Sequence, residues 1–90
     1  MKISVWDTYV KREDGKMMHF DILVPSDLKD VQSIFNFGLD YLKSKSVPSN
    51  ELSANECRFC HIEQANPEII ASINEKGYAI IEIENCGSFN

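Results

Sequence analysis

The residue types best suited to chemistry lie in one short segment, where Cys57, Cys60 and His61 form a Cys-x-x-Cys-His pattern. In c-type haem proteins this pattern holds haem covalently through its two thiols, and its histidine binds the iron. Such attachment normally takes place outside the cytoplasm, and the first residues of the sequence do not read as an export signal. We therefore expect no haem.

Zinc is a second possible use of the same segment. A structural zinc ion needs four nearby ligands, of which Cys57, Cys60 and His61 supply three, with Cys86 or His19 as a distant fourth. If the segment is a strand, Cys57 and His61 lie about 13 Å apart and Cys60 points to the opposite face. If it is a helix, the three side chains share one face and could chelate.

The strand is the interpretation that we adopt for residues 56–64. Arg58, Phe59, Cys60 and Ile62 favour a strand, although the run from Ser53 to Glu56 also fits the capping box that begins a helix. On this basis we assign no metal ligands and no catalytic residues, and we expect no cofactor. A small metal-binding or thiol-dependent enzyme that uses Cys57, Cys60, His61 and His19 is the alternative function.

A second set of candidate residues comes from the predicted pairing of residues 2–11 with residues 16–24. Asp14-Gly15 is the preferred centre of a two-residue hairpin turn, and pairing Glu13 with Lys16 places Tyr9 opposite Phe20. Alternation then puts Trp6, Thr8, His19 and Asp21 on one face, and it puts Asp7 on the opposite, apolar face between Val5 and Tyr9. With side chains from two later strands, the candidate ligand or interface face consists of Trp6, Thr8, His19, Asp21, His61, Glu63, Tyr78 and Glu82. This face is a solvated surface, a dimer interface or a ligand site.

Two helices are predicted to support the sheet. Ser26 can cap a helix that runs to about Lys45. The residues at the spacing of a buried stripe are Leu28, Val31, Phe35, Gly38, Leu39 and Leu42. Ile34, Phe37 and Tyr41 flank this stripe, which favours a wider core over a partner surface. Asn66-Pro67 begins a second helix that Gly77 ends, and a last strand follows from Tyr78 to Glu84.

The predicted fold is an α+β two-layer sandwich in ββαβαβ order, with a four-stranded mixed sheet and two helices on one face. The length of 90 residues suits one core, so residues 1–87 form a single domain and residues 88–90 a C-terminal tail. The formal net charge of −5 argues against a nucleic-acid partner. No run of residues is long and apolar enough for a membrane span. Three cysteines, an odd number, indicate free thiols and a cytoplasmic location.

Several motifs in combination suggest a family. They are Trp6-Asp7-Thr8-Tyr9-Val10, Met18-His19-Phe20-Asp21, the run from Glu56 to Glu63, and Lys76-Gly77-Tyr78. Over nearly its whole length the chain resembles the small bacterial proteins of the domain of unknown function family twenty twenty-four. The resemblance implies two helices with a β-sheet, and no activity that could be assigned to any residue.

The expected function is therefore that of a binding or interaction module with no assignable reaction, and the sequence identifies no small-molecule ligand for it. We also expect self-association into a homodimer or small homo-oligomer. The reason is that helices on one side would leave apolar side chains open to water on the other, namely Trp6, Val10, Leu23, Tyr78 and Ile80. Trp6 is expected to anchor the interface, because large aromatic side chains carry much of the binding energy at interface centres.

Overall fold

The computed structural model describes residues 2–47, 52–62 and 66–86, except for the side chains of residues 58–62. The elements in chain order are β1 (Ile3–Lys11), β2 (Met17–Pro25), α1 (Val31–Ser44), β3 (Leu52–Ile62), α2 (Pro67–Lys76) and β4 (Ala79–Glu84). This arrangement confirms the α+β class and the ββαβαβ order. The segment around Cys57 is a strand, as predicted, but it begins at Leu52, before the predicted start at residue 56.

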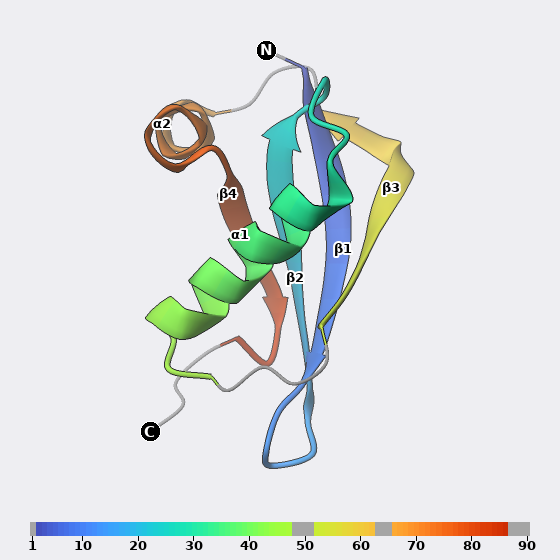
Figure 1. Cartoon of the computed structure of the whole chain (residues 1–90), viewed down its shortest axis with the longest axis vertical. Helices are drawn as coiled ribbons and strands as arrows, with labels where there is room; N and C mark the ends of the chain where they lie inside the picture. The colour runs from blue at the N-terminus through green and yellow to red at the C-terminus, as the bar shows by residue number, and fades with distance from the viewer. Residues whose placement is uncertain (1, 48–51, 63–65, 87–90) are drawn as a thin grey trace.

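The four strands form one sheet in the order β3-β1-β2-β4 (Figure 1). All three neighbouring pairs are antiparallel, so the prediction of a mixed sheet is wrong in this detail. A mixed sheet would require a strand reached through a helix to pair with a strand of the same direction. Here the hairpin occupies the centre, and β3 and β4 each add to an outer edge beside an antiparallel neighbour.

The turn of the first hairpin is one residue longer than predicted, which shifts the register by one. The Arg12 amide donates to the Lys16 carbonyl at 2.8 Å, and the Gly15 amide donates to the Arg12 carbonyl at 3.0 Å. These bonds enclose a three-residue loop in which Gly15 takes the left-handed conformation, at a φ of 86°. A type I turn followed by one left-handed residue is a common hairpin loop, and it uses Asp-Gly as readily as the two-residue turn does.

The shifted register redistributes the side chains of the hairpin. Tyr9 lies opposite His19, and Phe20 lies opposite Thr8. The prediction that Tyr9 and Phe20 share a face is therefore wrong. We call the two surfaces the α1 face and the reverse face. The α1 face carries Trp6, Thr8, Val10, Met18, Phe20, Ile22 and Val24, and the reverse face carries Ile3, Val5, Asp7, Tyr9, His19, Asp21 and Leu23.

Helix α1 covers the α1 face, and it begins later than predicted. Its cap is Asp30, whose carboxylate accepts a hydrogen bond from the Gln32 amide at 3.2 Å. Ser26, the predicted cap, lies in the turn that precedes the helix.

The buried side of α1 is rotated from the predicted stripe toward the flanking residues. Val31 and Leu39 belong to the predicted stripe, yet they are 47% and 44% exposed. The buried residues of the helix are Ile34, Gly38, Tyr41 and Leu42. Phe37 also packs against this core, so the flanking residues do widen the core as expected.

Helix α2 has the predicted boundaries. The Asn66 side chain accepts a hydrogen bond from the Ile69 amide at 2.8 Å, Pro67 occupies the first turn, and Gly77 ends the helix at a φ of 91°. A left-handed glycine is the usual C-terminal stop of a helix, because it lacks the Cβ that makes this conformation costly.

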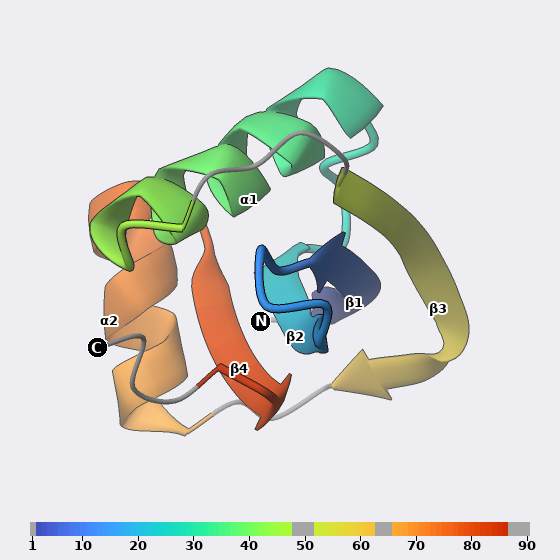
Figure 2. The same cartoon turned by 90° about the horizontal axis from the view of Figure 1, so that it is seen from below.

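The position of α2 differs from the predicted one. Figure 2 shows α1 across one face of the sheet and α2 along the β4 side. Ile73 of α2 packs with Ile3, Val5 and Leu23, which lie on the reverse face. The two helices therefore do not share one face. Within the described part of the chain, α2 covers the apolar end of the reverse face, and no helix covers its polar end.

Candidate functional site

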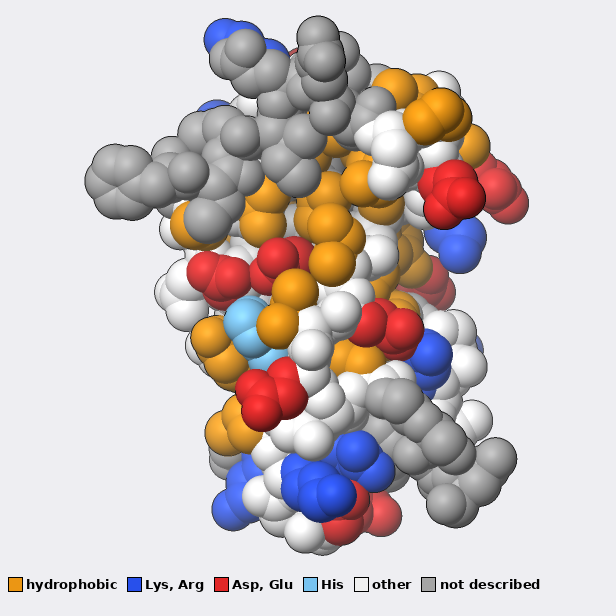
Figure 3. Space-filling model, turned by 180° about the vertical axis from the view of Figure 1, so that it is seen from behind, with side chains coloured by type: hydrophobic (Ala, Val, Ile, Leu, Met, Phe, Trp, Pro, Cys, Tyr) orange, Lys and Arg blue, Asp and Glu red, His pale blue; other side chains and the backbone are white. Residues whose placement is uncertain are grey.

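The polar end of the reverse face brings together Asp7 of β1 with His19 and Asp21 of β2. Asp7 lies directly opposite Asp21 in the antiparallel pair. His19 is two residues before Asp21 and therefore points to the same side. Seen from behind, this side shows histidine atoms between acidic side chains (Figure 3). The hairpin thus assembles a histidine and two carboxylates that are separated in the sequence.

The three side chains face one another without close hydrogen bonds to the imidazole. His19 Nε2 lies 3.5 Å from Asp7 Oδ1 and 3.8 Å from Asp21 Oδ1. Charge-assisted hydrogen bonds between such groups are about 2.7–2.9 Å long. Both His19 Nε2 and Asp21 Oδ1 are buried, and neither has a hydrogen-bond partner among the described residues. The cluster therefore leaves a gap that its own atoms do not bridge.

The two carboxylates of the cluster interact unfavourably when both are charged. The pKa of Asp21 is raised to about 6, first because burial disfavours the charged carboxylate, and then because the Asp7 side chain beside it favours a protonated Asp21 and repels the charged form. His19 acts in the opposite direction and lowers this pKa. Like charges placed directly opposite each other on neighbouring strands destabilise a sheet. A proton or a cation between the carboxylates would relieve the repulsion.

The raised pKa of Asp21 makes the stability of the folded protein depend on pH. The folded protein binds the Asp21 proton more tightly than an unfolded chain with a carboxyl pKa of about 3.9 does. The contribution of Asp21 to stability is therefore complete below about pH 4 and is lost as pH rises to about 6. The groups nearest to it are Asp7 and His19, and β4 places Ile81 opposite Asp21 and Glu84 opposite His19.

The Asp21→Asn variant, which cannot ionise, is expected to gain stability relative to the wild type between pH 4 and pH 6. Urea melts of both proteins at several pH values measure the difference. A constant difference across this range would contradict the assignment of the raised pKa to Asp21.

The surroundings hold the imidazole in place. The Tyr9 ring stacks on the His19 ring at a centroid distance of 4.3 Å and an interplanar angle of 10°. The buried thiol of Cys86 donates to the His19 carbonyl at 3.1 Å. The His19 side chain is only 19% exposed. The histidine is therefore oriented by packing before any ligand binds.

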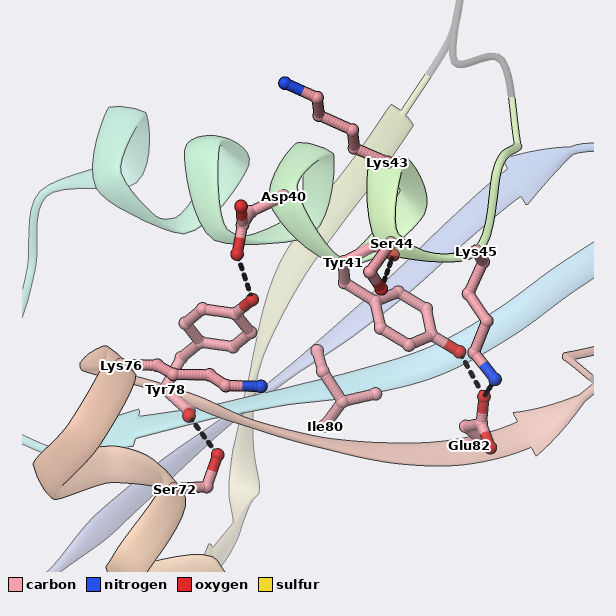
Figure 4. A pocket seen from close by; sticks show the side chains of 10 residues that line it. All are labelled: Asp40, Tyr41, Lys43, Ser44, Lys45, Ser72, Lys76, Tyr78, Ile80 and Glu82. Carbon is pink, nitrogen blue, oxygen red and sulfur yellow. Dashed lines mark hydrogen bonds and ion pairs between the residues drawn. The ribbon is translucent and has the colours of Figure 1, made fainter.

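A second feature is a cavity of about 650 Å³ on the other side of the sheet, between the last turns of α1 and α2 and the strand β4 (Figure 4). Tyr78 donates a hydrogen bond from its hydroxyl to Asp40 at 2.6 Å, and Tyr41 donates to Glu82. Lys45 lies 2.9 Å from Glu82. The residues that line the cavity are Asp40, Tyr41, Lys43, Ser44, Lys45, Ser72, Lys76, Tyr78, Ile80 and Glu82.

The two tyrosine hydroxyls stay protonated at all ordinary pH values. Burial raises the pKa of Tyr41 and of Tyr78, and the hydrogen bonds to Glu82 and Asp40 raise them further. The pKa of Glu82 is lowered, mainly because its charged form accepts from Tyr41 and from Lys45. The tyrosines therefore act here as fixed donors.

Comparison with known proteins places the chain in a family. The model of the family described as Domain of unknown function (DUF2024) matches residues 1–83. The chain belongs to the DUF2024 family. This confirms the resemblance noted in the sequence.

A solved structure with the same fold is the NMR structure of protein NE1680 from Nitrosomonas europaea, a structural genomics target. It is 37% identical to this DUF2024 chain, the match covers 97% of this chain and 100% of that chain, and the TM-score is 0.72. The search of curated proteins finds no match. Among the described residues, no helix has both the length and the apolar character that crossing a bilayer requires.

The residues of the candidate face predicted for this DUF2024 chain lie on different surfaces of the structure. Trp6 and Thr8 lie on the α1 face, where they are 7% and 0% exposed. Trp6 cannot anchor a dimer interface as predicted, because α1 covers it. His19 and Asp21 stay together on the reverse face, whereas Tyr78 and Glu82 line the cavity. The His61 side chain and Glu63 lie outside the described residues.

The Cys-x-x-Cys-His segment is only partly described. Cys57 lies on β3 opposite Val5. It is disulfide-bonded, so the prediction of a free thiol is wrong for Cys57 and right for Cys86. The side chains of Cys60 and His61 lie outside the described part of the structure.

Sequence reasoning missed Asp7, Asp40, Lys45 and Lys76 as site residues. Asp7 stood out as a carboxylate among apolar residues, and the correct register would have placed it beside His19. Asp40, Lys45 and Lys76 carried no signal, because α1 and α2 meet β4 through tertiary packing alone. A lysine in the last turn of a helix is ordinary in any sequence.

Proposed function

We propose that this domain binds a divalent transition-metal ion through Asp7, His19 and Asp21. The observation that supports the proposal is the unbridged gap between His19 Nε2 and the two carboxylates. One ligand atom from each of the three side chains can be chosen so that all lie within 4.8 Å of one another. The proposal specifies the binding module that the sequence predicts, and it departs from the expectation of no cofactor.

The separations suit a metal ion better than a direct bond. Two ligand atoms on one tetrahedral zinc ion, each about 2.0–2.1 Å from it, lie about 3.3 Å apart. The two measured separations from His19 Nε2, 3.5 Å and 3.8 Å, need only a small inward movement to reach this value. Asp7 is the most exposed of the three side chains, at 39%, and can adjust most easily.

The charge and the ligand types agree with such an ion. A divalent cation would neutralise the two carboxylates that now repel each other. One imidazole with two carboxylates suits Zn²⁺, Mn²⁺ or Fe²⁺, because carboxylates favour Mn²⁺ and imidazole favours zinc and iron. The net charge of −5 also attracts cations to the protein. With three protein ligands, the ion would keep an open position for water or a substrate.

The test uses Mn²⁺, since this ion favours oxygen ligands over thiolates and so disfavours a cysteine site. Equilibrium dialysis of the purified protein followed by elemental analysis is expected to find one Mn²⁺ per chain. Asp7→Asn should bind it much more weakly, whereas Asp27→Asn, the same change at an exposed turn residue, should bind it like the wild type. No bound Mn²⁺ in the wild type, or equal binding by both variants, would exclude the site.

Self-association remains a prediction of the sequence. Among the side chains of the sheet that the structure describes, the exposed large apolar ones are Tyr9, Met17 and Ile83. If the chain does form a dimer, these residues replace Trp6 as the candidates for the contact.

A further inference from the structure

The cavity between α1, α2 and β4 is independent of the proposed metal site, since it shares no residue with it and α1 forms one of its walls. Its volume of about 650 Å³ lies within the range of about 300–1,000 Å³ that is usual for small-molecule pockets. Its lining comes from three elements, so the tertiary fold and not one local motif creates it.

The hydroxyl groups around the cavity are already used as donors inside the protein. Tyr41 and Tyr78 donate to carboxylates. Ser44 donates to the Tyr41 carbonyl at 2.6 Å, and Ser72 donates to the Tyr78 carbonyl at 2.8 Å. The donors left for a ligand are therefore the side-chain ammonium groups of the lysines.

Three lysines line the cavity, and they differ in their partners. Lys45 pairs with Glu82. In the part of the chain that the structure describes, Lys43 and Lys76 make no ion pair. Figure 4 shows Lys76 reaching across the cavity toward Ile80, whereas Lys43 points away from it. The ammonium group of Lys76 is therefore the cation best placed to meet a ligand.

The cavity also offers apolar surface beside this cation. Ile80 is half-buried on β4, and the rings of Tyr41 and Tyr78 stand on either side of it (Figure 4). Lys45 Nζ lies 5.9 Å from the centroid of the Tyr41 ring. A ligand that fits this arrangement has one anionic group and a small apolar body.

We propose that this cavity binds a small organic anion, a carboxylate or a phosphate monoester. Its anionic group meets Lys76, and its apolar body rests on Ile80 between Tyr41 and Tyr78. Lys43 and Lys76 also lie in the last turns of their helices, where a cation offsets the helix dipole. Because this role alone would affect stability and not ligand binding, the test measures binding.

The experiment is an NMR titration of amide signals with benzoate, with phenyl phosphate and with uncharged benzyl alcohol. We expect at least one of the two anions to shift amides of Tyr41, Lys76 and Ile80, and benzyl alcohol to have little effect; the anion that binds identifies the acid group. Lys76→Gln should weaken binding about tenfold, because a charge-assisted contact is lost. Lys16→Gln, the same change in the hairpin loop, should leave it unchanged.

Three results would overturn the proposal. The first is that neither anion shifts any amide signal up to about 10 mM, a concentration that detects even weak binding. The others are that benzyl alcohol causes equal shifts, and that Lys76→Gln and Lys16→Gln weaken binding equally. None of them depends on Mn²⁺ binding, so this proposal and the metal proposal fail or stand separately.

Discussion

Replacing Phe20 by alanine is expected to lower the free energy of unfolding by about 3–5 kcal/mol, the range for removing a large aromatic ring from a core. Phe20 is fully buried between the sheet and α1, and its ring lies 4.6 Å from the Tyr41 ring. The loss therefore includes apolar burial, the cavity left behind and an aromatic contact. Urea melts followed by circular dichroism measure it.

Tyr9→Ala provides the comparison, because the register that was predicted from the sequence placed both rings on the same apolar face. In the structure Tyr9 is 40% exposed on the reverse face, so its loss should cost only about 1 kcal/mol. Phe20→Leu, a milder change, covers the case in which Phe20→Ala does not fold. Similar losses for Tyr9→Ala and Phe20→Ala would support the register predicted from the sequence and contradict the observed register.

Replacing His19 by glutamine is expected to lower the affinity for Mn²⁺ by at least about 100-fold. Substituting groups that only orient a metal ligand already costs about 10–100-fold, and the loss of the ligand itself should cost more. Glutamine is neutral and of similar length, so the fold should survive. Titration calorimetry of the wild type and the variant measures the ratio.

The matched control is His61→Gln, because His19 and His61 are the two histidines of the chain. This change should leave the affinity for Mn²⁺ unchanged. If His61→Gln bound Mn²⁺ more weakly and His19→Gln bound it like the wild type, the result would favour the metal-binding alternative built on the Cys-x-x-Cys-His segment.

Local signals predicted much of the fold. Asn66, Pro67 and Gly77 set the ends of α2 correctly, because capping depends on residues a few positions apart. The element order followed from alternation and helical periodicity for the same reason. Strand pairing through β3 and β4 depends on long-range contacts, and this explains why the mixed sheet was wrong.

The sequence did not predict the cluster of Asp7, His19 and Asp21, because the length of the hairpin loop was ambiguous. Asp14-Gly15 fits both a two-residue and a three-residue hairpin loop, and the choice moves every side chain of one strand to the other face. The sequence therefore placed His19 and Asp21 beside Trp6 and Thr8, and it placed Asp7 on the opposite surface. The structure reverses this, with Asp7 beside His19 and Trp6 under α1.

The measurement that tests the metal site most directly is a long-range proton–nitrogen NMR spectrum of the histidine rings while Zn²⁺ is added. Zinc bound to an imidazole nitrogen changes the chemical shift of that nitrogen. The proposal predicts that the Nε2 signal of His19 shifts and saturates at one Zn²⁺ per chain, while the ring signals of His61 stay in place. An unchanged His19 signal at saturating Zn²⁺ would contradict a metal site at Asp7, His19 and Asp21.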